Sequence, residues 1–320
     1  MKKQIVVIAG PTAVGKTKFA LRAAKALDGE IVSCDSMQIY KYMNIGSAKP
    51  SAAELRKVRH HLVDFVDPSE DFSVARYQKL AKEAIADILS RGKIPVVAGG
   101  TGLYLNSLLY EMDFSQAQRD EQLRRTLGAE AELLGADYLY EKLRAKDPEA
   151  ASRIHPHNVK KVIRALEAAE QGRGVRDFSA CKEKCKDYEA ILIGLTRNRD
   201  ELYDIINKRV DLLVKQGLFA EVEELLARGL SEDDISMKGI GYKEIIACFD
   251  GMYTREEAID LIKKNTRHLA KRQLTWFRRY EDMHWINISD YKDEEAAIEE
   301  MLTWLKKKSG CTIKVTSPTT

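Results

Sequence analysis

The sequence predicts an α/β protein in which helices cover both faces of a parallel sheet and a helical insertion interrupts the chain. In residues 1–115, short apolar runs alternate with stretches of helical spacing, the pattern of parallel strands joined by helical crossovers. A glycine-rich loop follows the first apolar run directly. The alternation stops near residue 114 and resumes near residue 190, so the chain between them should be an insertion.

The length and composition fit a globular protein with more than one part. The chain has 320 residues, 44% of them hydrophobic and 32% charged, enough for one large or two modest cores. We expect an α/β core in two parts, a helical insertion and a tail, at 1–115 and 199–306, 116–198, and 307–320. The chain starts without signal-peptide character, and no apolar run is long enough to cross a bilayer. We therefore expect a cytoplasmic monomer without membrane contact.

The first half of the chain alternates between strands and helices. The apolar run at 4–9 predicts a buried strand, and apolar residues at helical spacing from Lys16 to Leu27 predict a helix directly after the loop. Ser73 and Gly92 suggest the two ends of a later helix. The further elements expected here are strands at 30–36 and 61–66, a helix at 74–91, a strand and glycine turn at 94–102, and a helix from Leu103.

The second half is helical apart from one strand. The charged, helix-patterned insertion is followed by an apolar run at 190–195, which predicts one more strand of the sheet. A single long helix is expected at 200–226, and then a glycine-rich turn at 236–244. The sequence T-R-E-E predicts a capping box that opens a helix at 254–280.

The glycine-rich loop is a predicted phosphate site, which makes the core P-loop-type. G-P-T-A-V-G-K-T at 10–17 matches the pattern at every fixed position, with the required strand before it and helix after it. Its backbone N–H groups can face inward at the positive end of a helix. Lys16 can neutralise phosphate oxygens, and the Thr17 hydroxyl can bind Mg²⁺. The predicted phosphate-binding residues are Gly10, Pro11, Thr12, Ala13, Val14, Gly15, Lys16 and Thr17.

Two other strand ends should lie beside this loop. Asp35 is the only carboxylate at a neighbouring strand end, where side chains point into the ligand crevice of such sheets. A helix N-cap or a solvated turn would also explain Asp35. G-G-T-G at 99–102 is a second glycine turn on the same edge and makes Thr101 a candidate donor to the phosphate or the reacting group.

Positive charge is concentrated in one segment. The net charge is only +3, so the overall balance does not indicate a nucleic-acid binder. The segment 263–279, however, carries many lysines and arginines and no acidic residue, interleaved with Trp276 and Phe277. A solvated helix face usually carries both signs, whereas this pattern suits a phosphate backbone and stacked bases.

The cysteines predict neither a disulfide framework nor a metal site. Five cysteines are scattered along the chain, an odd number. Cys181 and Cys185 lie four apart, with His155 and His157 upstream, but no second pair completes a zinc set.

Several motifs in order resemble the bacterial tRNA dimethylallyltransferase (tRNA isopentenyltransferase) family. The matching stretches are G-P-T-A-V-G-K-T, D-S-M-Q-I-Y at 35–40, G-G-T-G-L-Y at 99–104, R-I-H-P-H-N-x-x-K-V-I-R-A-L-E at 153–167, K-G-I-G-Y-K-E at 238–244 and A-K-R-Q-L-T-W-F-R at 270–278. Together they span nearly the whole chain up to about residue 280.

The resemblance implies transfer of a dimethylallyl group from dimethylallyl diphosphate to N6 of the adenosine 3′ of the anticodon (position 37), in tRNAs that read codons beginning with U. The P-loop would hold the donor's diphosphate, and ATP would not be the substrate. Lys16, the loop amides and Mg²⁺ on Thr17 would stabilise the leaving pyrophosphate. Asp35 would act as the general base for the N6 proton.

The resemblance also assigns contacts to tRNA. The target base must leave its stack to react, so the anticodon stem-loop would be held by the core and clamped by the insertion. Lys16, Asp35, Thr101 and Arg124 are the implied catalytic residues. The implied tRNA contacts are Asp35, Ser36, Met37, Gln38, Thr101, Arg124, Lys160, Lys161 and Arg164, to which the basic segment adds Arg267, Lys271, Arg272 and Arg278. Asn158 and Lys161 depart from the Asp and Arg of many relatives.

Three other functions fit parts of the sequence. A P-loop nucleoside or small-molecule kinase would share the loop and the sheet but would consume ATP. An enzyme that prenylates free adenine nucleotides would need neither the insertion nor the basic segment. An RNA-binding GTPase-like module is disfavoured because the sequence contains no N-K-x-D motif.

Overall fold

A computed structural model shows a chain folded into two compact units. It describes residues 3–112, 114, 120–172 and 183–309. The larger unit combines residues 1–110 with 184–320, and the smaller comprises 111–183. The insertion therefore ends before the expected limit of 198.

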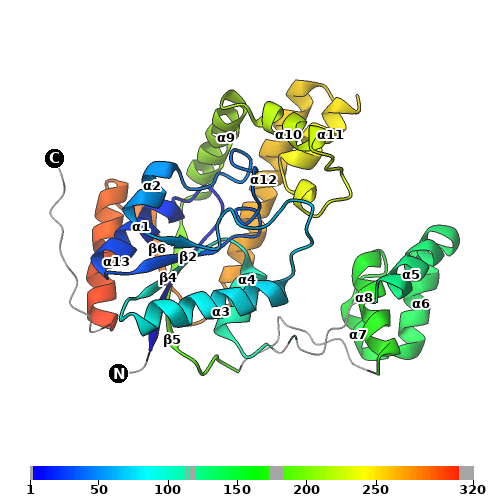
Figure 1. Cartoon of the computed structure of the whole chain (residues 1–320), viewed down its shortest axis with the longest axis horizontal. Helices are drawn as coiled ribbons and strands as arrows, with labels where there is room; N and C mark the ends of the chain where they lie inside the picture. The colour runs from blue at the N-terminus through cyan, green and yellow to red at the C-terminus, as the bar shows by residue number, and fades with distance from the viewer. Residues whose placement is uncertain (1–2, 113, 115–119, 173–182, 310–320) are drawn as a thin grey trace. The chain divides into compact units, whose positions relative to one another are not determined.

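The larger unit is built on a six-stranded sheet with the order β3-β2-β4-β1-β5-β6 (Figure 1). Every neighbouring pair is parallel. The predicted fold class is confirmed. The strands are β1 Gln4–Ala9, β2 Glu30–Cys34, β3 His60–His61, β4 Pro95–Gly99, β5 Glu189–Thr196 and β6 His284–Asn287.

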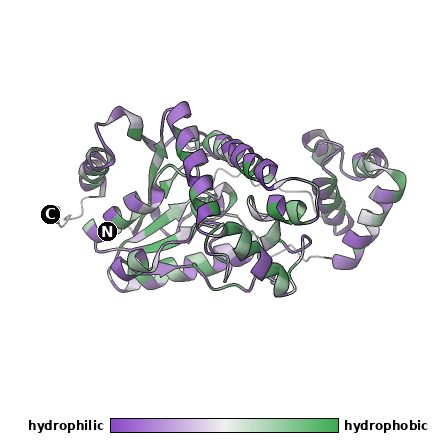
Figure 2. Cartoon of the chain, turned by 90° about the horizontal axis from the view of Figure 1, so that it is seen from above, coloured by the Kyte–Doolittle hydropathy of each residue, from purple (hydrophilic) through white to green (hydrophobic). Residues whose placement is uncertain are grey.

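Helices cover both faces of this sheet, as predicted. In β1, Ile5, Val7 and Ala9 belong to one buried cluster and Val6 and Ile8 to the other, because alternate strand residues point to opposite faces. Coloured by hydropathy, the strands are largely green and the covering helices carry purple residues (Figure 2). The helices are α1 Lys16–Ala26, α2 Ala52–Lys57, α3 Val74–Ser90, α4 Gly102–Leu109, α9 Arg199–Lys215, α10 Leu218–Ala227, α11 Tyr242–Phe249, α12 Arg255–Phe277 and α13 Glu294–Ser309.

The strand register brings the predicted site segments to one edge. Ala9 pairs with Gly99, and Cys34 pairs with Gly99 on the other side of β4. The chain leaves the sheet directly after each of these residues. The phosphate loop, Asp35 and the glycine turn therefore all begin at the carboxyl edge of three adjacent strands.

Most of the predicted helix ends are confirmed. The Ser73 side chain accepts from the N–H of Arg76 at the start of α3. Thr254 and Glu257 form the predicted capping box of α12. These local signals were reliable because a cap joins residues only three apart.

Two expectations were wrong. The strand expected at 61–66 is only His60–His61, because Leu62 and Asp64 adopt positive φ angles of 61° and 59°. The single helix expected at 200–226 is two helices, α9 and α10, because Gly217 between them has φ 105°. A residue in the left-handed region ends an α-helix.

Within its described residues, the smaller unit is a cluster of four helices with a core of its own. Its helices are α5 Glu121–Leu134, α6 Ala136–Lys146, α7 Pro148–Arg153 and α8 Val159–Glu170. Leu127, Leu139, Leu143, Val162 and Leu166 form its buried centre. The strand that ended the expected insertion, β5, lies in the main sheet because it pairs with β1 over six residues.

Some expectations lie partly beyond the described residues. Cys181 falls outside them, while the buried Cys185 thiol donates to an Asp187 carboxylate oxygen at 3.6 Å. Of the expected tail at 307–320, the first three residues belong to α13 and the others are not described. No helix within the described ranges is both long and apolar enough to cross a membrane.

Candidate active site

The phosphate loop turns sharply between β1 and α1. Ala13 and Gly15 adopt positive φ angles of 65° and 108°, and a residue in that region is least strained when it is glycine. Gly15 is the N-cap of α1 and has no side-chain cap. The first N–H groups of α1 therefore remain available for an anion, at the positive end of the helix dipole.

Lys16 is half-buried and folded back onto this loop. Its Nζ donates to the carbonyl oxygens of Gly10 at 3.1 Å and Pro11 at 2.8 Å. Burial lowers the pKa of the Lys16 ammonium to about 8, and the nearby Asp35 carboxylate partly opposes this shift. An anion in the loop would restore the preference for the charged form.

Asp35 forms a turn directly after β2. Its Oδ1 accepts the N–H groups of Met37 at 2.9 Å and Gln38 at 3.3 Å, a typical aspartate turn. Within the described part of the chain no group donates to Oδ2. One carboxylate oxygen thus fixes the side chain, and the other is available for a proton.

Thr101 is tied to the same turn. Its N–H donates to the Cys34 carbonyl at 3.1 Å, and its hydroxyl oxygen accepts the Ser36 N–H at 3.0 Å. The glycine turn after β4 is thereby joined to the chain on both sides of Asp35. The structure brings together Lys16, Asp35 and Thr101, three of the four implied catalytic residues.

A cavity of ≈ 450 Å³ opens beside these residues, all within the larger unit. Its polar side includes Lys16, Asp35, Ser36 and Thr101. Apolar side chains make up much of the remaining lining, most of them from helices of the second half of the chain. The apolar residues lining it are Met37, Ile206, Val210, Leu213, Leu218, Ile240, Ile262, Leu269 and Trp276.

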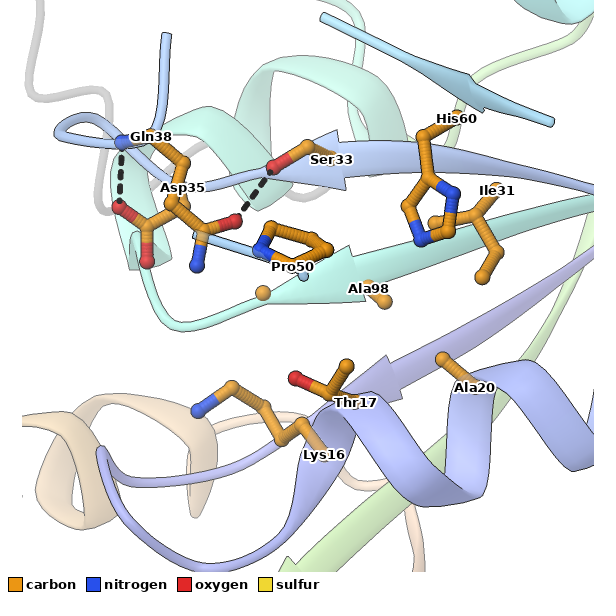
Figure 3. A pocket seen from close by; sticks show the side chains of 11 residues that line it. Lys16, Thr17, Ala20, Ile31, Ser33, Asp35, Gln38, Pro50, His60 and Ala98 are labelled. Atoms are coloured by element: carbon orange, nitrogen blue, oxygen red, sulfur yellow. Dashed lines mark hydrogen bonds between the residues drawn. The ribbon is translucent and has the colours of Figure 1, made fainter. Parts of the chain in front are cut away.

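A smaller cavity of ≈ 50 Å³ continues from it between α1 and the sheet. Figure 3 shows Lys16 and Thr17 on α1 facing Ser33 and Asp35 at the end of β2. The oxygens of Thr17 and Asp35 are hard ligands of the kind that Mg²⁺ prefers. The residues therefore fit a magnesium ion bound with a diphosphate, Thr17 being the predicted ligand.

Sequence reasoning missed one cation in the larger cavity, Arg209. It extends from α9 into the cavity beside Ile206 and Val210. Burial lowers the pKa of its guanidinium, and Asp35 opposes this shift. The sequence does contain a signal for Arg209, which lies three residues after Ile206 and therefore on the same apolar helix face. A buried arginine on such a face is costly unless it has an anionic partner.

The predicted basic residues of α12 lie in different environments in the structure. Arg272 lines the cavity, while Lys271 and Arg278 are exposed. Arg267 donates to the Asn207 side chain at 2.6 Å. Lys263, at the start of the basic segment, pairs with Asp211 at 2.6 Å, so α9 neutralises part of the positive charge.

The remaining predicted contacts lie in the smaller unit. Arg124 on α5 forms an ion pair with the buried Glu167 at 2.6 Å, so its guanidinium serves the packing of this unit. Asn158 caps α8 through the N–H of Lys161, the role that an aspartate would also fill. The other tRNA candidates here, Lys160, Lys161 and Arg164, are exposed on α8.

Comparisons with known sequences point to one family. A sequence profile of the family described as IPP transferase matches residues 38–280. A tRNA dimethylallyltransferase of Alkaliphilus oremlandii is 53% identical, over 94% of this chain and 97% of the relative. One of Clostridioides difficile is 47% identical, over 96% of this chain and 99% of the relative.

Comparisons with solved structures point to the same family. The full-length tRNA isopentenylpyrophosphate transferase of Bacillus halodurans matches with a TM-score of 0.72 and 44% identity, over 96% of this chain and 97% of that chain. A eukaryotic dimethylallyltransferase acting on tRNA matches with a TM-score of 0.81 and 26% identity, over 98% and 81% of the two chains.

Proposed function

Because the chain belongs to the IPP transferase family of tRNA dimethylallyltransferases, we propose that it transfers a dimethylallyl group from dimethylallyl diphosphate to N6 of adenosine 37 of tRNA. The substrates are tRNAs that read codons beginning with U. The product is N6-dimethylallyladenosine. The enzyme is a prenyltransferase and acts, in this proposal, as a cytoplasmic monomer.

One observation carries the proposal: a single cavity combines a phosphate loop, one carboxylate and an apolar wall. Asp35 is the only acidic residue among the described residues that line the cavity of ≈ 450 Å³. Lys16 and Arg209 supply cations to its lining. An isoprenyl diphosphate needs both characters in one site, a positive end for the diphosphate and an apolar end for the hydrocarbon.

The cations of the cavity serve the leaving group. As the bond between C1 of the dimethylallyl group and the diphosphate oxygen breaks, the electron pair leaves with pyrophosphate. Lys16, Arg209 and the amides of the loop then face an increased negative charge, which they stabilise without reorganising. Mg²⁺ held by Thr17 and the diphosphate would supply further positive charge there.

Asp35 serves the nucleophile. Adenosine N6 forms the new bond to C1 and loses a proton, which Oδ2 of Asp35 accepts. The fixed Oδ1 keeps the carboxylate aimed at the cavity. A positioned base of this kind contributes about 10² to 10⁴ in rate.

The tRNA would be held from outside the cavity. Adenosine 37 has to be unstacked to enter, at a cost of a few kcal/mol, and residues 35–38 with Thr101 would contact it. Exposed cations of α12 and α8 would bind the backbone of the anticodon stem-loop.

A transfer assay tests the proposal directly. The protein is incubated with labelled dimethylallyl diphosphate, unmodified tRNA and Mg²⁺, without ATP. Label should appear in tRNA at adenosine 37, with release of one pyrophosphate per transfer. Absence of label in tRNA would refute the proposal.

Two parallel reactions separate the alternatives. With labelled ATP and nucleosides, a kinase would transfer phosphate, which the proposed enzyme does not. With AMP in place of the anticodon stem-loop, an enzyme for free nucleotides would react at an equal rate, whereas we expect far slower transfer to AMP.

A further inference from the structure

Gln273 on α12 joins two loops of the site through both ends of its side-chain amide. Its Oε1 accepts the N–H of Thr12 in the phosphate loop at 2.8 Å. Its Nε2 donates to the carbonyl of Gly100 in the glycine turn at 2.9 Å. An amide is the uncharged side chain that offers an acceptor oxygen and a donor nitrogen on one carbon, so no other neutral residue of this length makes both bonds.

The glycine turn is in direct contact with α12. A Cβ at Gly100 would lie 2.5 Å from Gln273 Nε2, and one at Gly102 would lie 2.4 Å from Trp276 Cδ1. Gln273 and Trp276 are three residues apart and so lie on one face of the helix. Both glycines are therefore required by the approach of α12.

The same turn continues to the predicted base. Thr101 follows Gly100 and is joined to Cys34 and Ser36, the two neighbours of Asp35. Hydrogen bonds and the Gly100–Thr101 peptide bond thus connect Thr12, through Gln273 and the glycine turn, to the chain around Asp35. In the proposed function, one end of this connection would lie at the diphosphate and the other at the adenosine.

We propose that Gln273 is a positioning residue. It fixes the distance between the phosphate loop, which would bind the donor, and the glycine turn at 99–102, which is joined to the chain around the predicted base Asp35. The inference rests on the proposed function. It also assigns the Thr12 N–H to Gln273, which leaves the diphosphate to be bound by the other amides of the loop. Gln273 itself takes no part in bond making.

Gln273→Met is the main test, because methionine has nearly the same length and forms neither hydrogen bond. A misplacement of reacting groups by about 1 Å can lower a rate about 100-fold. We expect kcat for transfer to tRNA to fall by about 10- to 100-fold, while the KM for tRNA changes less than about twofold.

Gln273→Glu separates positioning from simple packing. Glutamate retains the acceptor for Thr12 but places a negative charge against the Gly100 carbonyl and beside the diphosphate cradle. The KM for dimethylallyl diphosphate should rise in this variant more than in Gln273→Met. A residue that only packed the fold would show no such dependence on the donor. The glutamate variant also provides the test if the methionine variant does not fold.

Gln78→Met is the matched control. Gln78 on α3 donates to the Ser107 carbonyl of α4 at 2.8 Å, so it supports the helix that follows the same turn but does not line the cavity. Its kcat and both KM values should equal those of the unmodified enzyme. If the Gln273 variants also retain normal kcat and donor KM, the inference is overturned. If the unmodified protein transfers no label, it is the proposed function that fails.

Discussion

At the scale of the residue, Lys16 illustrates how a half-buried charge can be prepared for a ligand. Its ammonium donates to two loop carbonyls, and burial lowers its pKa to about 8. Such a group holds its proton weakly until an anion arrives. The site therefore couples donor binding to proton uptake at alkaline pH.

This coupling predicts a pH dependence of donor affinity. Below about pH 8 Lys16 is already protonated, and affinity for dimethylallyl diphosphate should be constant with respect to this group. Above pH 8 the free enzyme loses the proton that binding requires, so the Kd should rise about tenfold per pH unit. Calorimetric titration of the protein with dimethylallyl diphosphate from pH 7 to 10 measures this Kd.

The control is Lys16→Arg, whose guanidinium stays charged throughout that range. Its donor affinity should be weaker but independent of pH between 8 and 10. An equal slope in both proteins would assign the pH dependence to another group.

Asp35→Asn removes the predicted base with little change of shape. The asparagine carbonyl can still accept the N–H groups of Met37 and Gln38, so the turn should survive. We expect single-turnover transfer to fall by about 10² to 10⁴, with tRNA binding unchanged in a filter assay. Transfer within a factor of three of the unmodified enzyme would exclude Asp35 as the base.

Sequence reasoning found the residues of the site that lie in local patterns. Lys16 and Thr17 are part of an eight-residue motif, and Asp35 directly follows a recognisable strand. Arg209 and Gln273 were missed because they act across the fold. Nothing adjacent to Gln273 in sequence indicates that Thr12 and Gly100 lie on either side of it.

At the scale of the element, the side chain of Glu221 on α10 holds the loop at residues 44–46. Both carboxylate oxygens of Glu221 on α10 are used: Oε2 accepts the N–H groups of Asn44 and Ile45, and Oε1 accepts that of Gly46 and the hydroxyl of Tyr242. Glu221 is only 8% exposed. Gly46 lines the cavity, so the carboxylate holds part of the cavity wall in place.

Glu221→Gln should therefore destabilise the protein. The amide replaces an acceptor by a donor and leaves buried N–H groups unpaired, at a cost of about 2–4 kcal/mol. Urea unfolding followed by circular dichroism gives this value. Glu223→Gln, an exposed site on the same helix, is the control and should change stability by less than about 0.5 kcal/mol.

Two of the elements that were not predicted bury few side chains. The strand β6 has four residues, of which only Ile286 is buried, so it shows no apolar run. The helix α2 has no buried residue, and its evidence is limited to a capping box at Ser51. Neither shows an apolar pattern of its own, whereas β1 and α3 are recognisable because each buries a continuous or periodic set of apolar side chains.

At the scale of the whole molecule, the positive charge that can attract RNA is limited to particular exposed side chains. The net charge of +3 gives no general attraction for RNA. Some lysines and arginines of the basic segment are also bound within the protein, as Lys263 is by Asp211. The electrostatic part of tRNA binding should accordingly come from a few side chains.

Salt titrations test this. Lys271→Ala and Arg278→Ala should each lower the slope of log Kd against log salt concentration by about 0.7–0.9, the value expected for one phosphate contact. Lys307→Ala, an exposed lysine on α13, should leave the slope unchanged. Unaltered slopes in the first two variants would remove α12 from the tRNA interface.

The order of the strands has a consequence for biosynthesis. The central strand β1 pairs on one side with β4 but on the other with β5, which follows the whole insertion, and the cavity also needs α9 and α12. Such sequence-distant pairing slows folding. While the ribosome is still making α12, Lys16 and Asp35 have been synthesised, but their cavity lacks the part of its wall that α12 supplies. Catalytic competence therefore arises near the end of translation, and a nascent chain released before α12 would contain the complete phosphate-loop motif without the activity.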